Sequence, residues 1–404
     1  MANEILTPSV IAKESLVLLE NKLGMAKRVH RDYQNEFVKV GDTVTIRKPV
    51  RFTTRPGASY SAQDVQEGST TIVMGNQIGV DFQFSTSDLT LKIDEFSKRY
   101  IEPAMSTMAH TVEADLTGLY NQVWNEVGTP GTTPNSFAAF STAPKRLDQM
   151  AVPLDQRMGV LDTDATWAIL TAQTGLFMQG KAVEAYEDGE IGTIGNVNLV
   201  QSQMVKVHTV GTKAGTPLIN GAAQNTTYTL SKTTNSQSLI TDAWTASSAI
   251  LKKGDIFTIA NVFAVNPATR QVTTVLQQFV VNADISADGS GNATINISPA
   301  IISAVGPYQN VNAAPADNAA ITVAGNASTG YAKNLIYHKN AFALVSRPME
   351  IPNGASWSAR ASYNGLSIRI ISDYDITADV QKTRLDMLYG VKAIYPDLAC
   401  RLTG

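Results

Sequence analysis

Apolar residues recur every three or four positions over one long stretch in the first third of the chain. They are Ile101, Met105, Met108, Val112, Leu116, Leu119, Val123 and Val127. This spacing places them on one face of a helix, so the pattern predicts a helix over residues 103–127, about 37 Å long at 1.5 Å per residue. Gly128 and Pro130 are expected to end it. Pro103 either begins it or kinks a longer helix that starts near Asp94.

The segments before this helix predict a shorter helix and two strands. Residues 9–23 form an amphipathic pattern with Thr7 and Pro8 as N-cap and first-turn proline. Apolar and polar residues alternate at 44–46 and again at 78–84, which is typical of half-buried strands. The polar stretch between these two strands predicts an extended two-stranded loop. A hairpin this long buries little of its own surface, and another subunit is the candidate for its support.

The segments after the helix predict an α/β piece and a returning set of strands. Residues 136–208 are expected to form the α/β piece, with an apolar strand at 166–170 and a short helix at 180–186. Further strand residues are expected at Val197, Leu199, Val205 and Val207. From residue 331 onward, four more strands are predicted at 335–338, 342–345, 366–372 and 385–394.

Composition changes abruptly between residues 211 and 330. This segment has ten charged residues in 120 and no glutamate, whereas the other 284 residues carry 57 charges. Thr, Asn, Ser, Ala and Gly dominate it, with short alternating runs such as 256–259, 272–281 and 293–297. The pattern is typical of an all-β module with many turns. Since charge density returns at residue 331, the module is expected to be an insertion into another domain.

Whole-chain properties exclude several classes of protein. With 404 residues, two or three domains are expected. The net charge of −3 provides no global basic field for nucleic-acid binding. The single cysteine, Cys400, excludes an internal disulfide and is interpreted as a small buried side chain. No apolar run reaches the length of a membrane span and no signal-peptide pattern is present, so a cytoplasmic location is expected.

Candidate catalytic and metal-binding patterns all fail at a chemically essential position. Residues 175–182 match a phosphate-binding loop except at Ala182, where Ser or Thr must bind Mg²⁺. Asp373, Asp375 and Asp379 lack the glycine and glutamate of a calcium loop. The four histidines, including His110 on the polar side of the predicted helix, have no metal-ligand spacing. The sequence therefore predicts a structural protein with no catalytic residue, metal or cofactor.

The order of these parts resembles the major capsid protein of tailed bacteriophages. The resemblance covers nearly the whole chain. The stretches that carry it in the main body are 96–103, 189–195, 342–348 and 388–394. Residues 251–262, 266–270 and 277–280 are similar to the inserted β-barrel domain of short-tailed-phage coat proteins.

The resemblance implies an α+β fold that combines an N-terminal arm, an extended loop, a spine helix, peripheral and axial domains, and an inserted all-β domain. The implied boundaries are 1–40 for the arm, 41–90 for the loop, 91–135 for the spine helix and peripheral domain, 136–210 for the axial domain, 211–330 for the insertion, and 331–404 for the return to the axial and peripheral domains.

The function implied by the resemblance is self-assembly into an icosahedral shell of pentamers and hexamers that encloses double-stranded DNA. The implied partners are further copies of the chain, a scaffolding protein, a portal protein and non-specifically held DNA, without a membrane. Assembly is expected in the host bacterial cytoplasm, and the final location is the virion. No lysine lies between Lys48 and Lys92, so the loop cannot form the lysine cross-link of some relatives. Folded sequence begins within ten residues, which implies a separate scaffolding protein.

Two groups of charged residues are the predicted contact sites. Arg51, Arg55, Asp64 and Glu67 give the loop both charge signs for pairs between subunits. Lys27, Arg28 and Arg31 form a basic segment that is either a solvated connecting arm or a phosphate contact on the inner face. The alternative function is a β-rich phage tail or adhesin-type structural protein, which the Thr- and Asn-rich middle favours. A hydrolytic enzyme is the third reading.

Overall fold

The computed structural model describes residues 8–33, 43–55, 57–60, 62–85, 100–174, 192–354 and 357–404. These residues form two compact units, each assembled from segments that are distant in the sequence. The first unit contains Met1–Thr45, Thr71–Leu116 and Phe342–Lys392, and the second contains Ile46–Thr70, Thr117–Ala341 and Ala393–Gly404. The chain combines helices with mainly antiparallel strands, which confirms the predicted α+β class.

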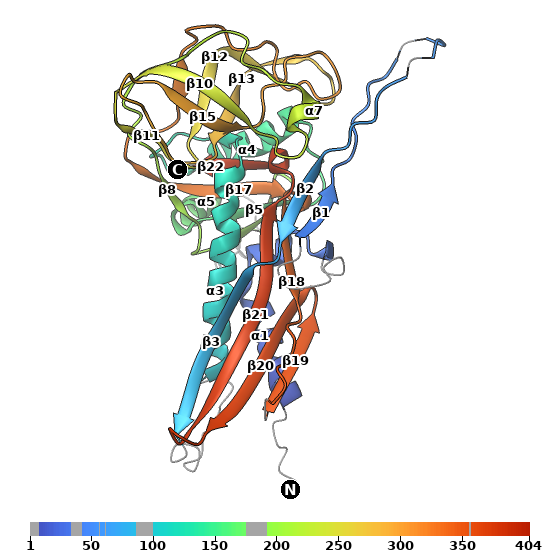
Figure 1. Cartoon of the computed structure of the whole chain (residues 1–404), viewed down its shortest axis with the longest axis vertical. Helices are drawn as coiled ribbons and strands as arrows, with labels where there is room; N and C mark the ends of the chain where they lie inside the picture. Colours follow the sequence, from blue (N-terminus) through green and yellow to red (C-terminus); the bar gives the residue numbers. More distant parts are fainter. Residues whose placement is uncertain are drawn as a thin grey trace. The chain divides into compact units, whose positions relative to one another are not determined.

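The first unit is a five-stranded antiparallel sheet with helices (Figure 1). Its strands are β3 (Asn76–Ser85), β18 (Phe342–Arg347), β19 (Trp357–Tyr363), β20 (Leu366–Asp375) and β21 (Val380–Ala393). The long strands β3 and β21 pair in continuous register from Asn76–Tyr389 to Ser85–Val380. Helix α1 (Pro8–Lys22) packs against β19 and β20. All these strands were predicted except β19.

Helix α3 (Glu102–Gly118) joins this unit through one buried carboxylate. Glu113 accepts hydrogen bonds from the backbone N–H groups of Gly24, Met25 and Ala26 at 2.8–2.9 Å. These donors lie at the start of the 3-10 helix η1 (Met25–Arg28), where helical N–H groups have no partner within the helix. The glutamate on the long helix therefore fixes the chain that leaves α1.

The helix predicted over residues 103–127 is shorter than expected. It begins at Glu102, so Pro103 lies in its first turn, and it ends at Gly118. A 3-10 helix, η4 (Leu119–Gln122), and the strand β4 (Glu126–Val127) follow. The backbone becomes extended because β4 pairs in parallel with β22 (Ala399–Thr403). Val123 and Trp124 are buried beyond the helix, which prolongs the apolar pattern without prolonging the helix.

Gly128 has a different role from the helix cap that was predicted. Its φ of +100° lies in the left-handed region, and it follows β4 rather than a helix. A Cβ atom there would lie 2.3 Å from the carbonyl oxygen of Thr403. Glycine is therefore required where the chain turns against β22. Residues 94–99, where the alternative longer helix was expected to begin, lie outside the described residues.

The second unit contains a seven-stranded mixed sheet. Its order is β4-β22-β17-β5-β7-β6, and β8 (Val207–Thr209) also pairs with β17 (Gly330–His338). The remaining strands are β5 (Arg157–Leu161), β6 (Thr193–Ile194) and β7 (Val197–Gln201). Helices α4 (Phe137–Gln149) and α5 (Thr163–Thr174) share a buried core with this sheet that includes Phe140, Ile169 and Cys400.

The predicted strand at 166–170 is wrong, because these residues belong to α5. Asp162 begins the helix: its carboxylate accepts the Ala165 N–H at 3.1 Å, and its carbonyl accepts the Thr166 N–H. Ala165 and Ile169 are buried four positions apart, whereas Trp167 is exposed. The predicted helix at 180–186 and the phosphate-loop match at 175–182 lie in the part of the chain that the structure leaves undescribed.

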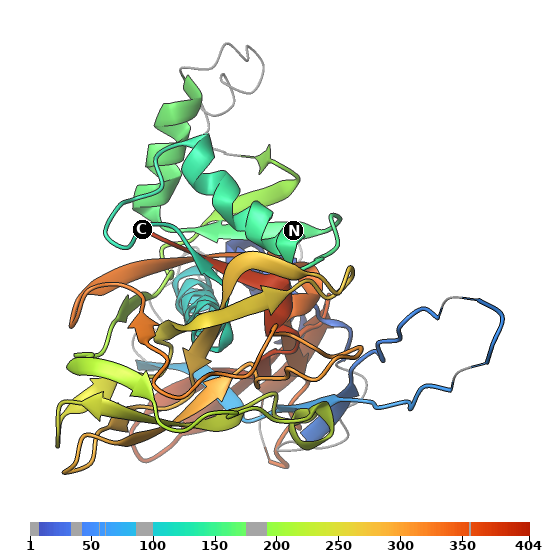
Figure 2. The same cartoon turned by 90° about the horizontal axis from the view of Figure 1, so that it is seen from above.

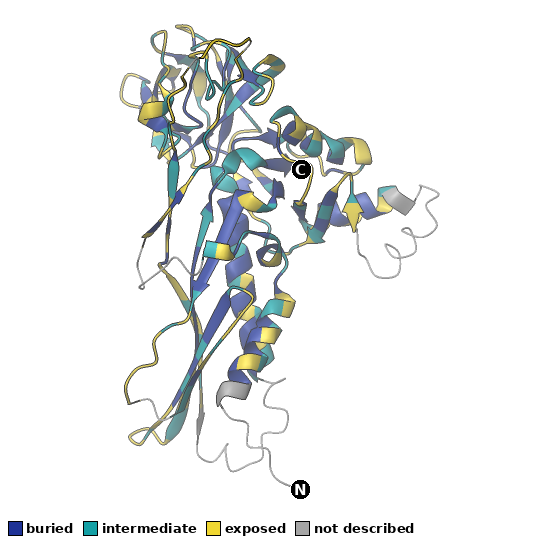
Figure 3. Ribbon diagram, turned by 90° about the vertical axis from the view of Figure 1, so that its right-hand side faces the viewer, coloured by how far each residue is buried: buried dark blue, intermediate teal, exposed yellow. Residues whose placement is uncertain are grey.

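Residues 211–330 contain a second, six-stranded antiparallel sheet. Its order is β16-β12-β13-β15-β10-β9. The strands are β9 (Gly215–Ile219), β10 (Gln237–Trp244), β12 (Ile256–Val265), β13 (Val272–Val281), β15 (Ala293–Ser298) and β16 (Ile321–Val323). A two-stranded sheet of β11 (Ala249–Leu251) and β14 (Ile285–Ser286) and the short helix α7 (Tyr228–Ser231) complete this module. Buried residues alternate with exposed or half-buried ones along strands such as β15, and many residues of the connecting loops are exposed (Figure 3).

The six-stranded sheet closes on itself. The two edge strands meet at a bridge between Leu218 and Ala320. Ile219 donates its N–H to Ala319, and its carbonyl accepts the Asn318 N–H. Closure removes the unpaired edges that an open sheet would expose. The interior is apolar, with residues such as Phe257, Phe279, Ile295 and Ile297 fully buried.

Candidate functional site: the extended loop and its anchor

Residues 48–68 form the extended loop, which leaves a two-stranded sheet of β1 (Thr43–Arg47) and β2 (Ser69–Val73). The loop was predicted, but β1 was expected to pair with the strand at 78–84. That strand pairs with β21 instead. Figure 2 shows the two chains of the loop running outward from their base.

Hydrogen bonds join the two chains of the loop at several points along its length, but they do not form a regular β-ladder. The Lys48 N–H donates to the Gly68 carbonyl at 2.7 Å. Farther from the base, the side chain of Gln63 makes hydrogen bonds of the kind that a paired backbone strand would make. Its oxygen accepts the N–H and hydroxyl of Thr53 at 2.8 and 3.0 Å, and its amide donates to the Thr53 carbonyl at 2.6 Å. The loop therefore keeps a defined two-chain form.

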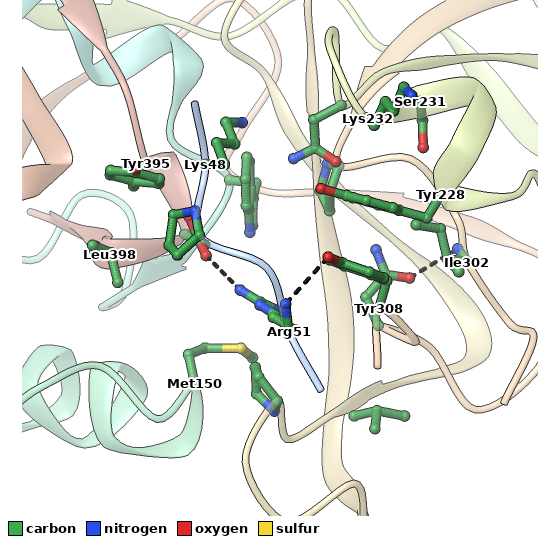
Figure 4. A pocket seen from close by; sticks show the side chains of 18 of the residues that line it. Lys48, Arg51, Met150, Tyr228, Ser231, Lys232, Ile302, Tyr308, Tyr395 and Leu398 are labelled. Carbon is green, nitrogen blue, oxygen red and sulfur yellow. Dashed lines mark hydrogen bonds and ion pairs between the residues drawn. The ribbon is translucent and has the colours of Figure 1, made fainter. Parts of the chain in front are cut away.

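Arg51 anchors the base of the loop (Figure 4). Its guanidinium lies 3.2 Å from the carboxylate of Asp397, in the 3-10 helix η6 (Pro396–Leu398). Its backbone N–H donates to the hydroxyl of Tyr308 at 3.2 Å. Tyr308 in turn donates to the carbonyl of Gln66 at 2.8 Å. The loop base is thus held by the β-rich module and by the chain leading into β22.

A cavity of about 380 Å³ lies beside this anchor. Aromatic and apolar side chains form much of its wall, and basic groups from the loop and from α7 reach it. Its lining includes Lys48, Trp124, Met150, Tyr228, Lys232, Tyr308, Tyr395 and Leu398.

The four charged loop residues predicted as contacts do not gather at one place. Arg51 pairs with Asp397 within the chain. Glu67 lies 3.6 Å from Arg47, and Arg55 donates to the Gly57 carbonyl. Asp64 is exposed. Since all these groups are largely exposed, their pairs contribute little to folding.

The sequence interpretation overlooked the exposed apolar residues of the loop. Tyr60 is 88 % exposed, Val65 65 % and Phe52 60 %. Single exposed apolar side chains are ordinary on protein surfaces. Three on one thin loop form a surface that a second molecule can cover.

The basic segment at residues 27–31 divides into exposed and buried parts. Lys27 is exposed, and Arg28 is half-buried and donates to the Gly24 carbonyl at 3.0 Å. Arg31 differs from the expected phosphate contact because it is buried. It donates to the carbonyls of Ala26 and Asn364, and its burial lowers the pKa of the guanidinium. Arg31 is therefore a structural residue of the first unit.

A buried polar network joins the seven-stranded sheet to the β-rich module. Lys333 lies 2.8 Å from Glu126, and Arg401 lies 3.5 Å from the same carboxylate. Burial alone would raise the pKa of Glu126, but Lys333 and Arg401 outweigh it and hold the pKa below its ordinary value. The module contributes Gln278, whose side chain bonds both the N–H and the carbonyl of Glu126.

His208, one of the four histidines, belongs to a second part of this network. Its Nδ1 lies 3.0 Å from the Tyr120 hydroxyl and its Nε2 lies 2.7 Å from Asp255. Asp255 also accepts the N–H groups of Gly211 and Lys252. His208 and Asp255 are 4 % and 1 % exposed, so a substrate cannot reach them and their role is structural.

Across the residues that the structure describes, no group of three or more His, Cys, Asp or Glu side chains could hold a metal ion. Within the same residues, no helix is long and apolar enough to cross a membrane. Cys400 is fully buried, as its sequence context predicted. Asp375 is the last residue of β20, where it is half-buried, accepts the Thr377 N–H of the following turn and pairs with Lys382.

Comparison with known proteins identifies the class of molecule to which these features belong. A family described as "P22 coat protein - gene protein 5" matches residues 1–404. A protein described as "Major capsid protein", from Acyrthosiphon pisum secondary endosymbiont phage 1, is 22 % identical over 413 residues that cover 98 % of this chain and 97 % of that protein. The chain belongs to the P22 coat protein family and is a major capsid protein of a bacteriophage.

Solved structures with similar chains also come from phages. One, described as Mycobacterium phage Che8, has a TM-score of 0.49 at 12 % identity and covers 94 % of this chain and 90 % of its own. Another, the capsid of Ralstonia phage GP4, has a TM-score of 0.46 at 10 % identity and covers 97 % and 88 %. The family match replaces the tail-protein or adhesin alternative.

Proposed function

We propose that many copies of this chain assemble into an icosahedral shell of pentamers and hexamers that encloses double-stranded DNA. A scaffolding protein would direct a first procapsid, a portal protein would join the same shell, and assembly would take place in the host bacterial cytoplasm. Family membership supports the shell. The exposed apolar residues of the extended loop, Phe52, Tyr60 and Val65, carry the proposal that the chain is incomplete without neighbours.

In this proposal the extended loop lies on an adjacent subunit. Its apolar side chains supply contact area, and Arg55 and Asp64 supply charges of both signs near the tip. Each exposed ion pair is worth only about 0.2–1 kcal/mol, but a closed shell repeats each contact many times. Contacts of this strength are reversible, so an incorrectly placed subunit can dissociate.

Deletion of residues 57–67 tests the role of the loop. The described residues of this segment are exposed except Gln66, which is one of the two contacts of Tyr308. The contacts of Arg51 with Tyr308 and Asp397 remain, so we expect a folded monomer with little change in thermal unfolding that forms no shells. Negative-stain microscopy with a scaffolding protein present measures the outcome. A control variant changes Gly289 and Ser290, which are exposed turn residues of the β-rich module, to alanine. Normal particles from the loop deletion would contradict the proposal.

We also propose that Lys27 and Arg28 contact DNA phosphate on the inner face of the shell. Such contacts are electrostatic and independent of base sequence. Filled particles of a variant with Lys27→Ala and Arg28→Ala should lose DNA at a lower temperature than wild-type particles, whereas empty particles should have equal stability. The difference should shrink as salt is raised. Equal DNA retention by variant and wild-type particles at low salt would contradict the proposed phosphate contact.

A further inference from the structure

One hydroxyl group of the β-rich module connects both chains of the extended loop. Tyr308 lies in the segment between β15 and β16. Its hydroxyl accepts the Arg51 N–H of the outgoing chain at 3.2 Å and donates to the Gln66 carbonyl of the returning chain at 2.8 Å. This side chain therefore supplies a link that the two loop chains do not make directly at that level.

A second tyrosine holds Tyr308 in this position. The rings of Tyr228 and Tyr308 are nearly parallel, with centroids 3.5 Å apart and an interplanar angle of 4° (Figure 4). Burial, and then the neighbouring Tyr308, raise the pKa of Tyr228 to about 12. Tyr228 therefore stacks on the Tyr308 ring without a phenolate charge of its own at neutral pH.

The loop is shaped to receive these tyrosines. A Cβ atom on Gly68 would lie 2.5 Å from the Tyr228 hydroxyl and 2.8 Å from the Lys232 carbonyl, so only glycine permits this close approach. The hydroxyl of Thr229, also on α7, donates to the Gln66 side chain at 3.2 Å. Tyr228 and Thr229 of α7, and the carbonyl of Lys232 directly after it, thus face the returning chain of the loop.

We propose that Tyr228 and Tyr308 are positioning residues that set the direction in which the extended loop leaves the subunit. The inserted module would then control where the loop meets the next copy of the chain. This inference rests on the proposed contact between the loop and a neighbour, and it assigns to the module a task beyond its own folding.

The length of the loop explains why direction matters at its base. About seven residues separate Arg51 from Ala58 at the tip, and an extended chain of that length spans roughly 23 Å. A tilt of about 10° at the anchor would therefore move the tip by roughly 4 Å. A side chain at the tip would miss its partner entirely after such a shift. The anchor itself is partly exposed, so its loss should leave the fold intact.

Tyr308→Phe is the direct test, because it removes the hydroxyl and retains the stacked ring. Gly68→Ala disturbs the same contact from the side of the loop. Tyr363→Phe, at a tyrosine 61 % exposed on β19, is the matched control. Spin labels on Ala58→Cys at the loop tip and Ser290→Cys on the module report the distance between them. The native Cys400 does not interfere, since it is buried and its thiol pKa is raised to about 12.

In the monomer, Tyr308→Phe should lower the ratio of anchored to released loop about tenfold, which is the effect expected for losing a neutral hydrogen-bond bridge. The distance distribution should broaden accordingly, as it should for Gly68→Ala, while Tyr363→Phe matches the wild type. Thermal unfolding should change little in all three. In assembly assays, the first two variants should form shells several-fold more slowly or form irregular particles.

Two results would overturn the inference while leaving the loop's own role intact. One is an unchanged distance distribution in Tyr308→Phe. The other is a broadened distribution combined with normal shells, in a protein whose tip deletion forms none. Normal shells from the tip deletion would instead contradict the proposed contact between the loop and a neighbouring subunit. The two failures are therefore distinguished by different experiments.

Discussion

At the scale of single residues, we expect the buried charged side chains to affect the stability of this protein more than the exposed charged side chains do. Glu126 and Lys333 are 8 % and 3 % exposed, and Arg401 is fully buried. Removing one member of such a group leaves the others buried without compensation. The exposed pair of Arg384 and Asp81, whose side chains are more than half exposed, has water as an alternative partner.

Glu126→Gln should therefore lower the free energy of unfolding by about 3 kcal/mol at pH 7. Asp81→Asn, the matched exposed control, should lower it by less than about 1 kcal/mol. Urea titration of the monomer measures both values. Similar effects for the two variants would show that the buried network contributes no more than a surface pair.

The pH dependence of the Glu126→Gln effect follows from the depressed pKa of this carboxylate. A group whose pKa is lower in the folded state stabilises the fold above its unfolded pKa, near 4.3. The contribution is lost as pH falls through the folded value. The difference between wild type and Glu126→Gln should therefore be constant from about pH 6 to 7 and shrink below about pH 4.

The residues that hold the loop could not be identified from the sequence. Arg51 and Tyr308 lie 257 positions apart, and neither belongs to a recognisable motif. Sequence reasoning selected loop residues by charge alone, which identified Arg51 but assigned it to a neighbour. Glu126 was hidden for a similar reason, because Lys333 lies 207 positions away and residue 126 was expected to lie within the predicted helix.

At the scale of elements, periodicity located most helices and strands. It failed where one continuous apolar pattern covers both a helix and the extended segment that follows it. The pattern from Ile101 to Val127 is continuous, yet α3 ends at Gly118 because pairing with β22 requires extended backbone. The short apolar run at 166–170 fits a strand or a buried helix equally by composition. The capping signal at Asp162 distinguished the two and was not used. Partners of predicted strands remained unknown, since alternation identifies a face and not a neighbour.

The cap of α5 can be tested directly. Asp162→Ala should lower the free energy of unfolding by about 1 kcal/mol, because the Ala165 N–H loses its acceptor. Asp162→Asn should have a much smaller effect, since asparagine is an equally good N-cap. Chemical denaturation of both variants provides the comparison. Equal losses would indicate that the charge of Asp162, rather than its capping oxygen, stabilises this region.

At the scale of the whole molecule, the β-rich module is inserted where its two ends are adjacent. Strand β8 leads into it and β17 leaves it, and these strands pair with Thr209 opposite Gly330. Adjacent ends allow a module to be inserted without displacing its host. We infer that residues 211–330 fold on their own. The host is different, since the module supplies Asp255 to His208, the Gly254 carbonyl to Arg401 and Gln278 to Glu126.

Because the host depends on the module but the module does not depend on the host, the two parts of the chain should behave differently when each is expressed alone. Residues 211–330 expressed alone should give a β-rich circular dichroism spectrum and a cooperative melt, because the closed sheet has its own apolar interior and Asp255 would become solvated. The remaining chain, joined by a short turn between Thr209 and Gly330, should be poorly soluble, because Arg401 and Glu126 would lose partners while still buried.

A substituted form of the shortened chain tests whether the unpaired charges, rather than the absence of the module as such, cause the poor solubility. Replacing Arg401, Glu126 and Lys333 together by Met, Leu and Met in the shortened chain removes the charges that the module had satisfied. Well-packed apolar groups can replace a buried ionic cluster at little or no cost, so solubility and a cooperative melt should return. A shortened chain that folds well without these substitutions would show that the host does not depend on the module. A disordered isolated module would show that the dependence runs the other way.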